Sequence, residues 1–149
     1  MSRGLEEVMH DGKRLAIIVY HDYAGNGVNF FTPEKFSQQL AFMEHKAGHD
    51  IDAHHHTRTP REVEFTQEVL IIRKGKLRVD FYDDKKEYIS SRVLNANDVI
   101  LLASGGHGFK VLEDVEMVEV KQGPFVGSDD KVRFDGIPDA SVKIIKRGE

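Results

Sequence analysis

Short apolar runs separated by turn-forming residues recur along most of the chain. The stretch from Lys76 to Tyr82 alternates strictly, with apolar side chains at Leu77, Val79 and Phe81. Because side chains two residues apart share a face of a strand, this stretch predicts a strand buried on one face and solvated on the other. Similar runs predict strands over residues 15–20, 38–45, 69–74, 76–82, 87–94, 99–102, 108–112 and 115–121. The pattern predicts an all-β domain, either a sandwich or a small barrel.

Glycine, proline and asparagine mark the expected turns. Gly75, between two lysines, predicts a hairpin, because glycine tolerates a positive φ. The stretch from Asn95 to Asp98 predicts a second turn, and Gly105-Gly106 predicts a third break. Thr32-Pro33-Glu34 predicts one short helical turn, with a threonine N-cap and a proline at the first helical position.

The chain changes character from Gly123 onward. Breaks that contain glycine or proline recur there, and only Val142–Ile145 has the composition of a strand. We expect this C-terminal tail, residues 123–149, to wrap around the domain or to pair with a neighbouring subunit.

Composition narrows the class of protein. A chain of 149 residues with 40% hydrophobic and 31% charged residues is typical of one globular domain, residues 1–149. Its 21 basic and 25 acidic residues give a net charge of −4, which argues against a nucleic-acid or membrane-surface binder. The absence of cysteine excludes disulfides, thiolate metal sites and cysteine nucleophiles. The longest aliphatic run, Leu15–Tyr20, is too short to span a bilayer, so we expect a cytoplasmic protein with a small-molecule partner.

Histidine is concentrated in one segment. Five of the eight histidines fall between His45 and His56. A solvated polar loop is one interpretation of such a cluster. In an extended chain, however, His54 and His56 share a face and His55 points the other way. Two neighbouring imidazoles on one face are half of a site for a divalent transition metal.

Two further side chains supply the other half of such a site. Glu68 shares parity with Leu70 in an apolar strand, and His107 shares parity with Phe109. If those faces line a barrel interior, the carboxylate is costly there unless it is paired, protonated or bound to a cation. Taken singly, each is also consistent with a polar residue at the end of a strand. Together with the two histidines they form a chemically sensible set of three nitrogens and one oxygen.

These residues resemble the first motif of the cupin superfamily, G-x5-H-x-H-x3-4-E-x6-G. Gly48, His54, His56, Glu68 and Gly75 fill its named positions. The spacing departs from the motif in one place, because eleven residues separate the second histidine from the glutamate.

The lengthened loop, Thr57 to Gln67, leaves Glu62 and Glu64 as rival carboxylates. We prefer Glu68, because it stands at the right distance from the glycine that closes the motif and opens an apolar strand. We expect the loop to lie beside the barrel mouth and to supply Arg58 or Arg61 to an anionic substrate.

A looser second motif completes the resemblance. Asn97 to Leu102 and Ala103 to His107 resemble its glycine-aspartate strand and its turn to the last histidine, without the proline and the final asparagine. The resemblance covers residues 38–121. It implies a double-stranded β-helix, the cupin jelly-roll barrel, with one divalent metal (Fe, Mn, Ni or Zn) held by His54, His56, Glu68 and His107. We also expect a homodimer in which Leu15–Tyr20 or Val142–Ile145 packs across subunits, because open sheet edges must be covered or paired.

The family includes isomerases, dioxygenases, epimerases and binding proteins, so the fold does not settle the function. We favour a metal-dependent enzyme acting on a small polar, sugar-like metabolite. The alternatives are a non-catalytic metal- or ligand-binding protein and a metal-free epimerase of the sugar-nucleotide type. The last strand has two possible registers. In one, Glu119 and Lys121 point inward and are a candidate acid or base and a candidate anion contact. In the other, Val118 and Val120 face the core and both charged side chains are solvated.

Overall fold

A computed structural model describes residues 3–149 and gives the chain eight strands and two short 3-10 helices. The elements are β1 (Leu5–His10), β2 (Lys13–Val19), β3 (Gly27–Phe30), β4 (Ala41–Glu44), β5 (Glu68–Tyr82), β6 (Tyr88–Asn95), β7 (Val99–Leu102), β8 (Gly106–Lys121), η1 (Gly127–Asp130) and η2 (Asp139–Ser141). The all-β class is therefore confirmed. Within residues 3–149, no helix is long and apolar enough to span a membrane.

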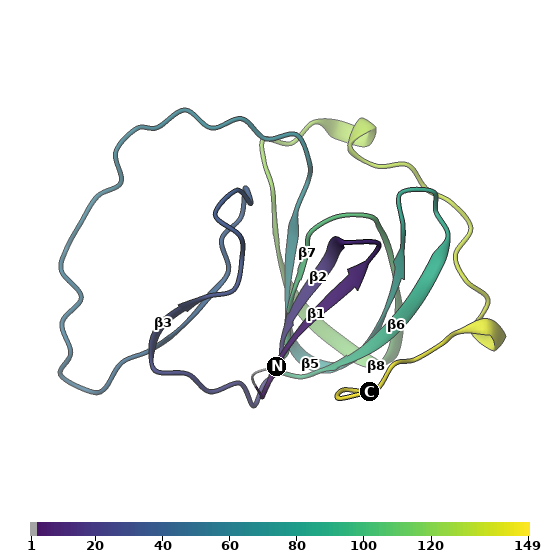
Figure 1. Ribbon diagram of the computed structural model, residues 1–149, viewed down its shortest axis with the longest axis horizontal. Coiled ribbons are helices and arrows are strands. Elements are labelled where there is room, and N and C mark those ends of the chain that lie inside the picture. Colours follow the sequence, from purple (N-terminus) through teal and green to yellow (C-terminus); the bar gives the residue numbers. More distant parts are fainter. Residues whose placement is uncertain (1–2) are drawn as a thin grey trace.

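Strand β5 organises the larger sheet, whose order is β1-β2-β7-β5-β6, with β8 on the other edge of β5. β7 pairs with Glu68–Ile71 and β6 with Lys76–Tyr82, while β8 pairs with β5 from end to end. All these pairs are antiparallel. The sheet curls into a half-barrel, and β3 and β4 form a separate two-stranded sheet (Figure 1).

The hairpin predicted at Gly75 is wrong, because β5 continues through this residue and bends. Gly75 has φ 82°, and a Cβ built on it would lie 2.0 Å from the backbone oxygen of Asp114 in β8. The β5–β8 ladder shifts register on both sides of Lys74 and again just after Lys76. The glycine thus permits a bulge between two long strands, which also explains why β8 has no break near Asp114.

The core lies on the concave side of the curled sheet. Leu77, Val79 and Phe81 are 0–1% exposed, which confirms the apolar face predicted for this strand. They pack with buried side chains from β1, β2, β6 and β7: Val8, Leu15, Ala16, Ile18, Leu94, Ile100 and Leu102. Leu70 and Ile72, from the first half of β5, belong to the same cluster, so both halves of this one strand contribute to one core.

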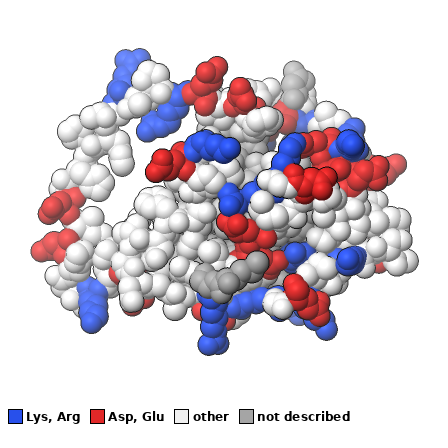
Figure 2. Space-filling view, in the orientation of Figure 1, with Lys and Arg blue, Asp and Glu red and all other residues white. Residues whose placement is uncertain are grey.

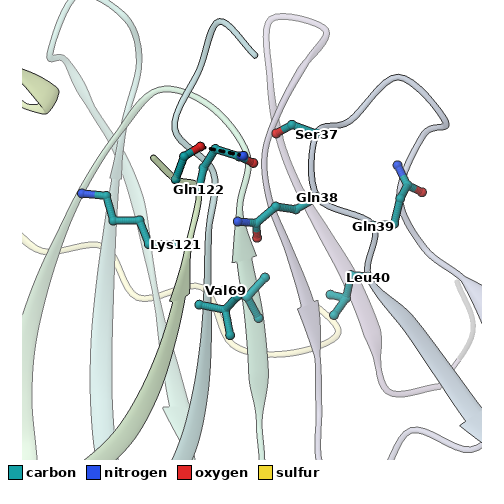
Figure 3. A pocket seen from close by; sticks show the side chains of 9 residues that line it. Ser37, Gln38, Gln39, Leu40, Val69, Lys121 and Gln122 are labelled. Carbon is teal, nitrogen blue, oxygen red and sulfur yellow. Dashed lines mark hydrogen bonds between the residues drawn. The ribbon is translucent and has the colours of Figure 1, made fainter. Parts of the chain in front are cut away.

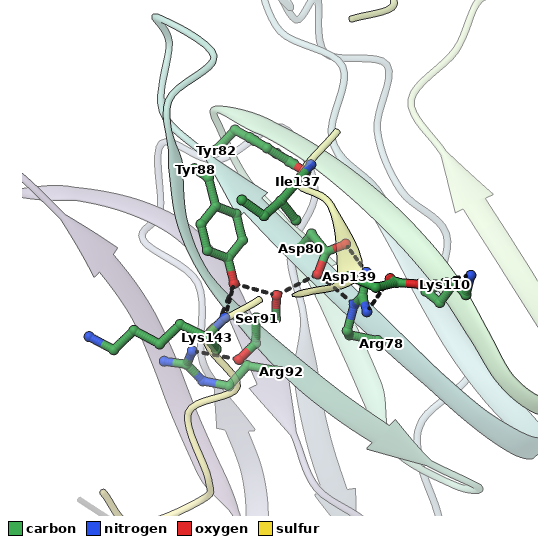
Figure 4. Close-up of polar contacts among 10 residues, drawn as sticks. All are labelled: Arg78, Asp80, Tyr82, Tyr88, Ser91, Arg92, Lys110, Ile137, Asp139 and Lys143. Atoms are coloured by element: carbon green, nitrogen blue, oxygen red, sulfur yellow. Dashed lines mark hydrogen bonds and ion pairs between the residues drawn. The ribbon is translucent and has the colours of Figure 1, made fainter. Parts of the chain in front are cut away.

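The other face of the same stretch is also buried, contrary to the solvated face that alternation predicts. Arg78, Asp80 and Tyr82 are 7%, 5% and 3% exposed. The Arg78 guanidinium donates from Nε to Asp80 Oδ1 at 2.8 Å and from Nη1 to Asp139 Oδ1 at 2.9 Å. Asp139 belongs to the C-terminal tail, which lies across this face (Figure 4). A buried pair of charges is tolerated because each partner is hydrogen-bonded.

The C-terminal tail wraps around the half-barrel through polar contacts. The amide of Ile137 donates to the Tyr82 hydroxyl at 2.9 Å, and the amide of Lys143 donates to the Tyr88 hydroxyl at 2.9 Å. Ser91 exchanges backbone hydrogen bonds with Lys143 and Ile145, at 2.9 and 3.0 Å. The tail adds only an isolated bridge to β6, so Val142–Ile145 does not form the strand that its composition allows.

Two further sequence-based expectations change in the structure. Leu15–Tyr20 coincides largely with β2, which lies between β1 and β7 and packs inside its own chain, so it is not available to a neighbouring subunit. In place of the helical turn expected at Thr32-Pro33-Glu34, the structure has a single turn closed by a hydrogen bond from the amide of Phe36 to the backbone oxygen of Pro33, at 3.0 Å. The Thr32 hydroxyl does not cap this turn, because it accepts from the amide of Leu40 at 3.2 Å, and no helix follows.

Candidate functional site

Glu68 begins β5 and is 8% exposed. Its register partners are Leu102 of β7 and Lys121 of β8. Because directly paired residues share a face of a sheet, Glu68 lies on the same side as the core residue Leu102. The inward orientation expected for this carboxylate agrees with its burial.

His107, near the start of β8, contacts Glu68. Its Nε2 lies 3.1 Å from Glu68 Oε2, although His107 is paired in register with Phe81 at the far end of β5. The curl of the sheet brings these two strand beginnings together at one end of the half-barrel. The His107 side chain is 30% exposed, so the pair is reached from solvent on the histidine side.

The pKa of Glu68 is lowered, contrary to the expectation that burial without a cation would raise it. The main cause is the hydrogen bond from His107, which outweighs desolvation by burial. Electrostatic attraction to His107 and to the nearby Lys121 lowers the pKa of Glu68 further. The contacts of Glu68 with His107 and Lys121 therefore favour the charged form of this carboxylate.

Lys121 and Asp130 extend this cluster. Lys121 Nζ lies 3.8 Å from Glu68 Oε1 and forms an ion pair with Asp130 in η1. The Thr66 hydroxyl donates to Asp130 Oδ1 at 2.6 Å. The pKa of Asp130 is lowered first by Lys121 and then by Thr66, and the pKa of Lys121 is raised chiefly by Asp130. Lys121 thus lies between the carboxylates of Glu68 and Asp130.

The sequence leaves two registers possible for the last strand, and the pairing of β8 with β5 decides between them. Glu119 is opposite Leu70, and Lys121 is opposite Glu68, so both lie on the core side. Glu119 is nevertheless exposed, because the half-barrel is open along β8. Val118 and Val120 lie on the outer side and are 43% and 50% exposed.

His54 and His56 lie elsewhere, on the loop that joins β4 to β5. Their ring centroids are 5.4 Å apart, and His54 Nδ1 lies 2.8 Å from the backbone oxygen of Asp52. Every residue from 43 to 66 is exposed, and Figure 1 shows this loop arching away from the half-barrel. The loop therefore does not lie beside the barrel mouth, as the sequence predicts. It comes back to the half-barrel only at Thr66.

The remaining candidates on this loop are exposed. Arg58 and Arg61 are both exposed, and Arg61 Nη1 donates to the backbone oxygen of Thr59 at 3.3 Å. Glu62 and Glu64, the rival carboxylates, are exposed as well. The structure joins Glu68 to His107 but does not join them to His54 and His56. No cluster of three possible metal ligands occurs among the described residues.

A shallow groove of about 470 Å³ lies next to the cluster formed by Glu68, His107, Lys121 and Asp130. It runs between Ser37–Leu40 on one side and Val120–Gly123 with Val69 on the other (Figure 3). Gln67, 6% exposed, holds the two sides together. Its backbone oxygen accepts from Gln38 Nε2 at 3.1 Å and from the amide of Gln122 at 3.0 Å.

Sequence reasoning missed Asp130, Thr66 and Gln67. Asp130 stands in a stretch rich in glycine and aspartate, whose pattern predicts only an interruption of regular structure. Its contact with Lys121 depends on the path of the C-terminal tail. The polar pair Thr66-Gln67, directly before the apolar start of β5, was the available signal for polar contacts at a strand entrance, although only Gln67 is buried. Acidic and basic side chains are interspersed over the face in Figure 2.

Comparison of the chain with family profiles, with curated proteins and with solved structures gave no match.

Proposed function

We propose that the protein is a cupin-type metalloprotein that holds one divalent transition metal through His54, His56, Glu68 and His107 and acts on a small polar, sugar-like metabolite. The contact between Glu68 and His107 carries this proposal. It places two of the four expected ligands side by side at one end of a curled sheet, although they come from different strands.

The geometry of this pair fits a metal site. Two ligand atoms that each lie about 2 Å from one ion are separated by roughly 3–3.5 Å. Glu68 Oε2 and His107 Nε2 are 3.1 Å apart. Carboxylate oxygen and imidazole nitrogen also suit the same divalent metals, from manganese to zinc.

The set of four is completed in this proposal only if the loop brings its histidines to the pair. His54 and His56 are near each other and exposed, so they are free to move without breaking core contacts. The closed form would be the double-stranded β-helix, of which the half-barrel supplies one curled sheet. A homodimer is part of the same proposal, and the outer edge of β1 offers it a strand edge, since β1 pairs only with β2 in the described chain.

A bound metal would supply Lewis acidity toward a hydroxyl or carbonyl group. The chain's own residues would do the rest. Glu119, on the core side of β8 and exposed, is placed to exchange a proton with a ligand at the open side. Arg58 and Arg61 would reach an anionic group if the loop closes. Lys121 holds the Glu68 carboxylate in its charged form from the side opposite His107.

One observation favours a second function, a metal-free acid–base reaction of the sugar-nucleotide epimerase type. Glu68 and His107 already form a hydrogen-bonded carboxylate–imidazole pair without a cation, and the histidine is the exposed member. Such a pair can take a proton from a substrate carbon, and a second acid on the opposite face of the substrate would have to deliver the new proton for the configuration to invert.

Elemental analysis of untagged protein, purified without added metal, separates the two functions. One equivalent of a transition metal that disappears in His107→Ala supports the metalloprotein. Metal-free protein that epimerises a sugar nucleotide in the presence of a chelator would replace it with the second function. A metal-containing protein that turns over none of a panel of sugars would instead be a non-catalytic binder.

A further inference from the structure

His45 and His49 lie at the start of the exposed loop between β4 and β5, and neither belongs to the metal centre proposed above. Their imidazole rings are stacked, with centroids 4.3 Å apart and planes inclined by only 5°. This is closer than the 5.4 Å between the rings of His54 and His56. The two histidines therefore form a pair of their own within the histidine-rich segment.

A tight turn brings the two rings together. The amide of His49 donates to the backbone oxygen of Lys46 at 3.1 Å, which closes a turn over residues 46–49. Gly48 has φ 83°, a conformation that glycine adopts without steric strain, and a Cβ built on it would meet nothing within 4 Å. The turn thus depends on glycine for its backbone conformation. Because it reverses the chain directly after His45, this residue and His49 meet face to face.

The spacing of the rings fits two nitrogens on one ion. Two imidazoles that bind an ion side by side, each through a nitrogen about 2 Å from it, have ring centres roughly 4–5 Å apart. The observed 4.3 Å is within this range. Since the stacked planes are parallel, each ring must turn about its Cβ–Cγ bond before the nitrogens converge. Such rotation is fast in exposed side chains, and both residues are exposed.

The donor set selects the class of ion. No third histidine, aspartate or glutamate joins the pair in a cluster of possible ligands within the part of the chain that the structure describes. Zinc sites use three or four protein ligands, and Mn²⁺ prefers oxygen. Cu²⁺ takes nitrogen ligands at right angles to each other in a tetragonal geometry, and it binds most tightly among the divalent first-row metals.

We propose that His45 and His49 form a second metal site, which binds one Cu²⁺ ion through two imidazole nitrogens and completes its coordination with water. The second metal site shares no ligand with the centre proposed at Glu68 and His107, so it does not depend on that proposal. It also differs in the ion that it prefers, because it offers no carboxylate.

A copper titration of the untagged chain, followed by isothermal calorimetry, tests the second metal site. His45→Ala and His49→Ala should each remove one Cu²⁺ equivalent, or weaken its binding by at least about tenfold, because the remaining imidazole lacks the chelating partner. His55→Ala is the matched control, since it removes an exposed histidine of the same loop that lies outside the pair. It should change neither the number of equivalents nor their affinity.

Three results would overturn the proposal. One is an unchanged copper titration in His45→Ala or in His49→Ala, because a chelate needs both rings. Another is an equal loss in His55→Ala, which would assign the copper to the histidines at positions 54–56. The third is a copper-induced association of chains that disappears in His45→Ala, since the two nitrogens would then come from different molecules.

A parallel titration with Mn²⁺ keeps the second metal site apart from the proposed function. Mn²⁺ binding should be the same in the unmodified chain, in His45→Ala and in His49→Ala, and its loss in these variants would overturn a separate site. Mn²⁺ binding that needs His107, with an unchanged copper titration in His45→Ala, would retain the proposed function and overturn the second metal site. Copper loss in His45→Ala and His49→Ala, in a protein that purifies without metal, would support the second metal site and overturn the proposed metalloprotein.

Discussion

Glu68 and His107 are in contact at 3.1 Å, although their register positions stand at opposite ends of the β5–β8 ladder. Glu68 is paired with Lys121 and His107 with Phe81. The two strands must therefore curl until the two ends of β8 meet around one carboxylate. The bend at Gly75 makes this curl possible, and it concentrates titratable groups at one end of the half-barrel.

The histidines of the metal face give the first prediction. His54→Ala, His56→Ala and His107→Ala should each abolish stoichiometric metal binding, because each removes one of four ligands. His55→Ala is the matched control and should leave binding nearly intact, since His55 faces away in an extended segment. Isothermal titration with Mn²⁺ or Zn²⁺ measures this. Equal losses for His55→Ala and His54→Ala would contradict an extended segment.

The role of Glu68 as the carboxylate ligand can be tested by replacing it with glutamine, which removes the charge and keeps the shape of the side chain. Glu68→Gln should weaken metal affinity by at least about tenfold, because Glu68 is buried beside His107. Glu62→Gln and Glu64→Gln should change it little, since both residues are exposed on the loop. The same titration decides the matter. Loss of binding in Glu62→Gln or Glu64→Gln, with binding kept in Glu68→Gln, would move the ligand into the inserted loop.

Stability should fall at acid pH through Glu68. Its pKa is lowered from the ordinary value of 4.5, so the folded state holds the charged form more strongly than the unfolded state does. The stabilisation is present above pH 4.5 and is lost as the pH falls through the lower folded-state pKa. Urea unfolding between about pH 7 and pH 3 should show this loss, and Glu68→Gln should reduce it. An unchanged pH dependence in Glu68→Gln would show that other carboxylates account for the loss.

The buried ion pair under the tail gives a stability prediction. Arg78→Ala or Asp80→Ala should cost about 3–5 kcal/mol, because either leaves a buried charge without its partner. Asp139→Asn should cost less than about 1 kcal/mol, since Asp139 is 62% exposed and the pair survives without it. Urea denaturation compares the three. Equal costs for Asp139→Asn and Arg78→Ala would mean that the tail, not the pair, supplies the stability.

Gly75 and Gly12 form a matched pair for the bulge. Both have positive φ, 82° and 75°, so alanine costs about 1–2 kcal/mol of backbone strain at either. At Gly75 the new Cβ also meets the Asp114 backbone oxygen, whereas at Gly12 nothing lies within 4 Å. Gly75→Ala should therefore lower the free energy of unfolding clearly more than Gly12→Ala. Equal effects would show that the bulge relaxes freely.

The sequence by itself determined the all-β class, most strand positions and the buried face of Leu77, Val79 and Phe81. Those features depend on local alternation and turn chemistry, which are written in neighbouring residues. The inward position of Glu68 followed from the same parity. Gly75 was misread because a positive φ serves a turn and a bulge equally well, and only the partner strand distinguishes them.

Only the tertiary structure decided the rest. Arg78 and Asp80 read as solvated because alternation cannot report that a distant tail covers the second face. Asp130 joins the site for the same reason, through a contact between residues far apart in the chain. Whether His54 and His56 reach His107 is likewise a matter of strand pairing across the sheet edge. Such pairing is set by hydrogen bonds and burial between remote segments, and no local pattern encodes these.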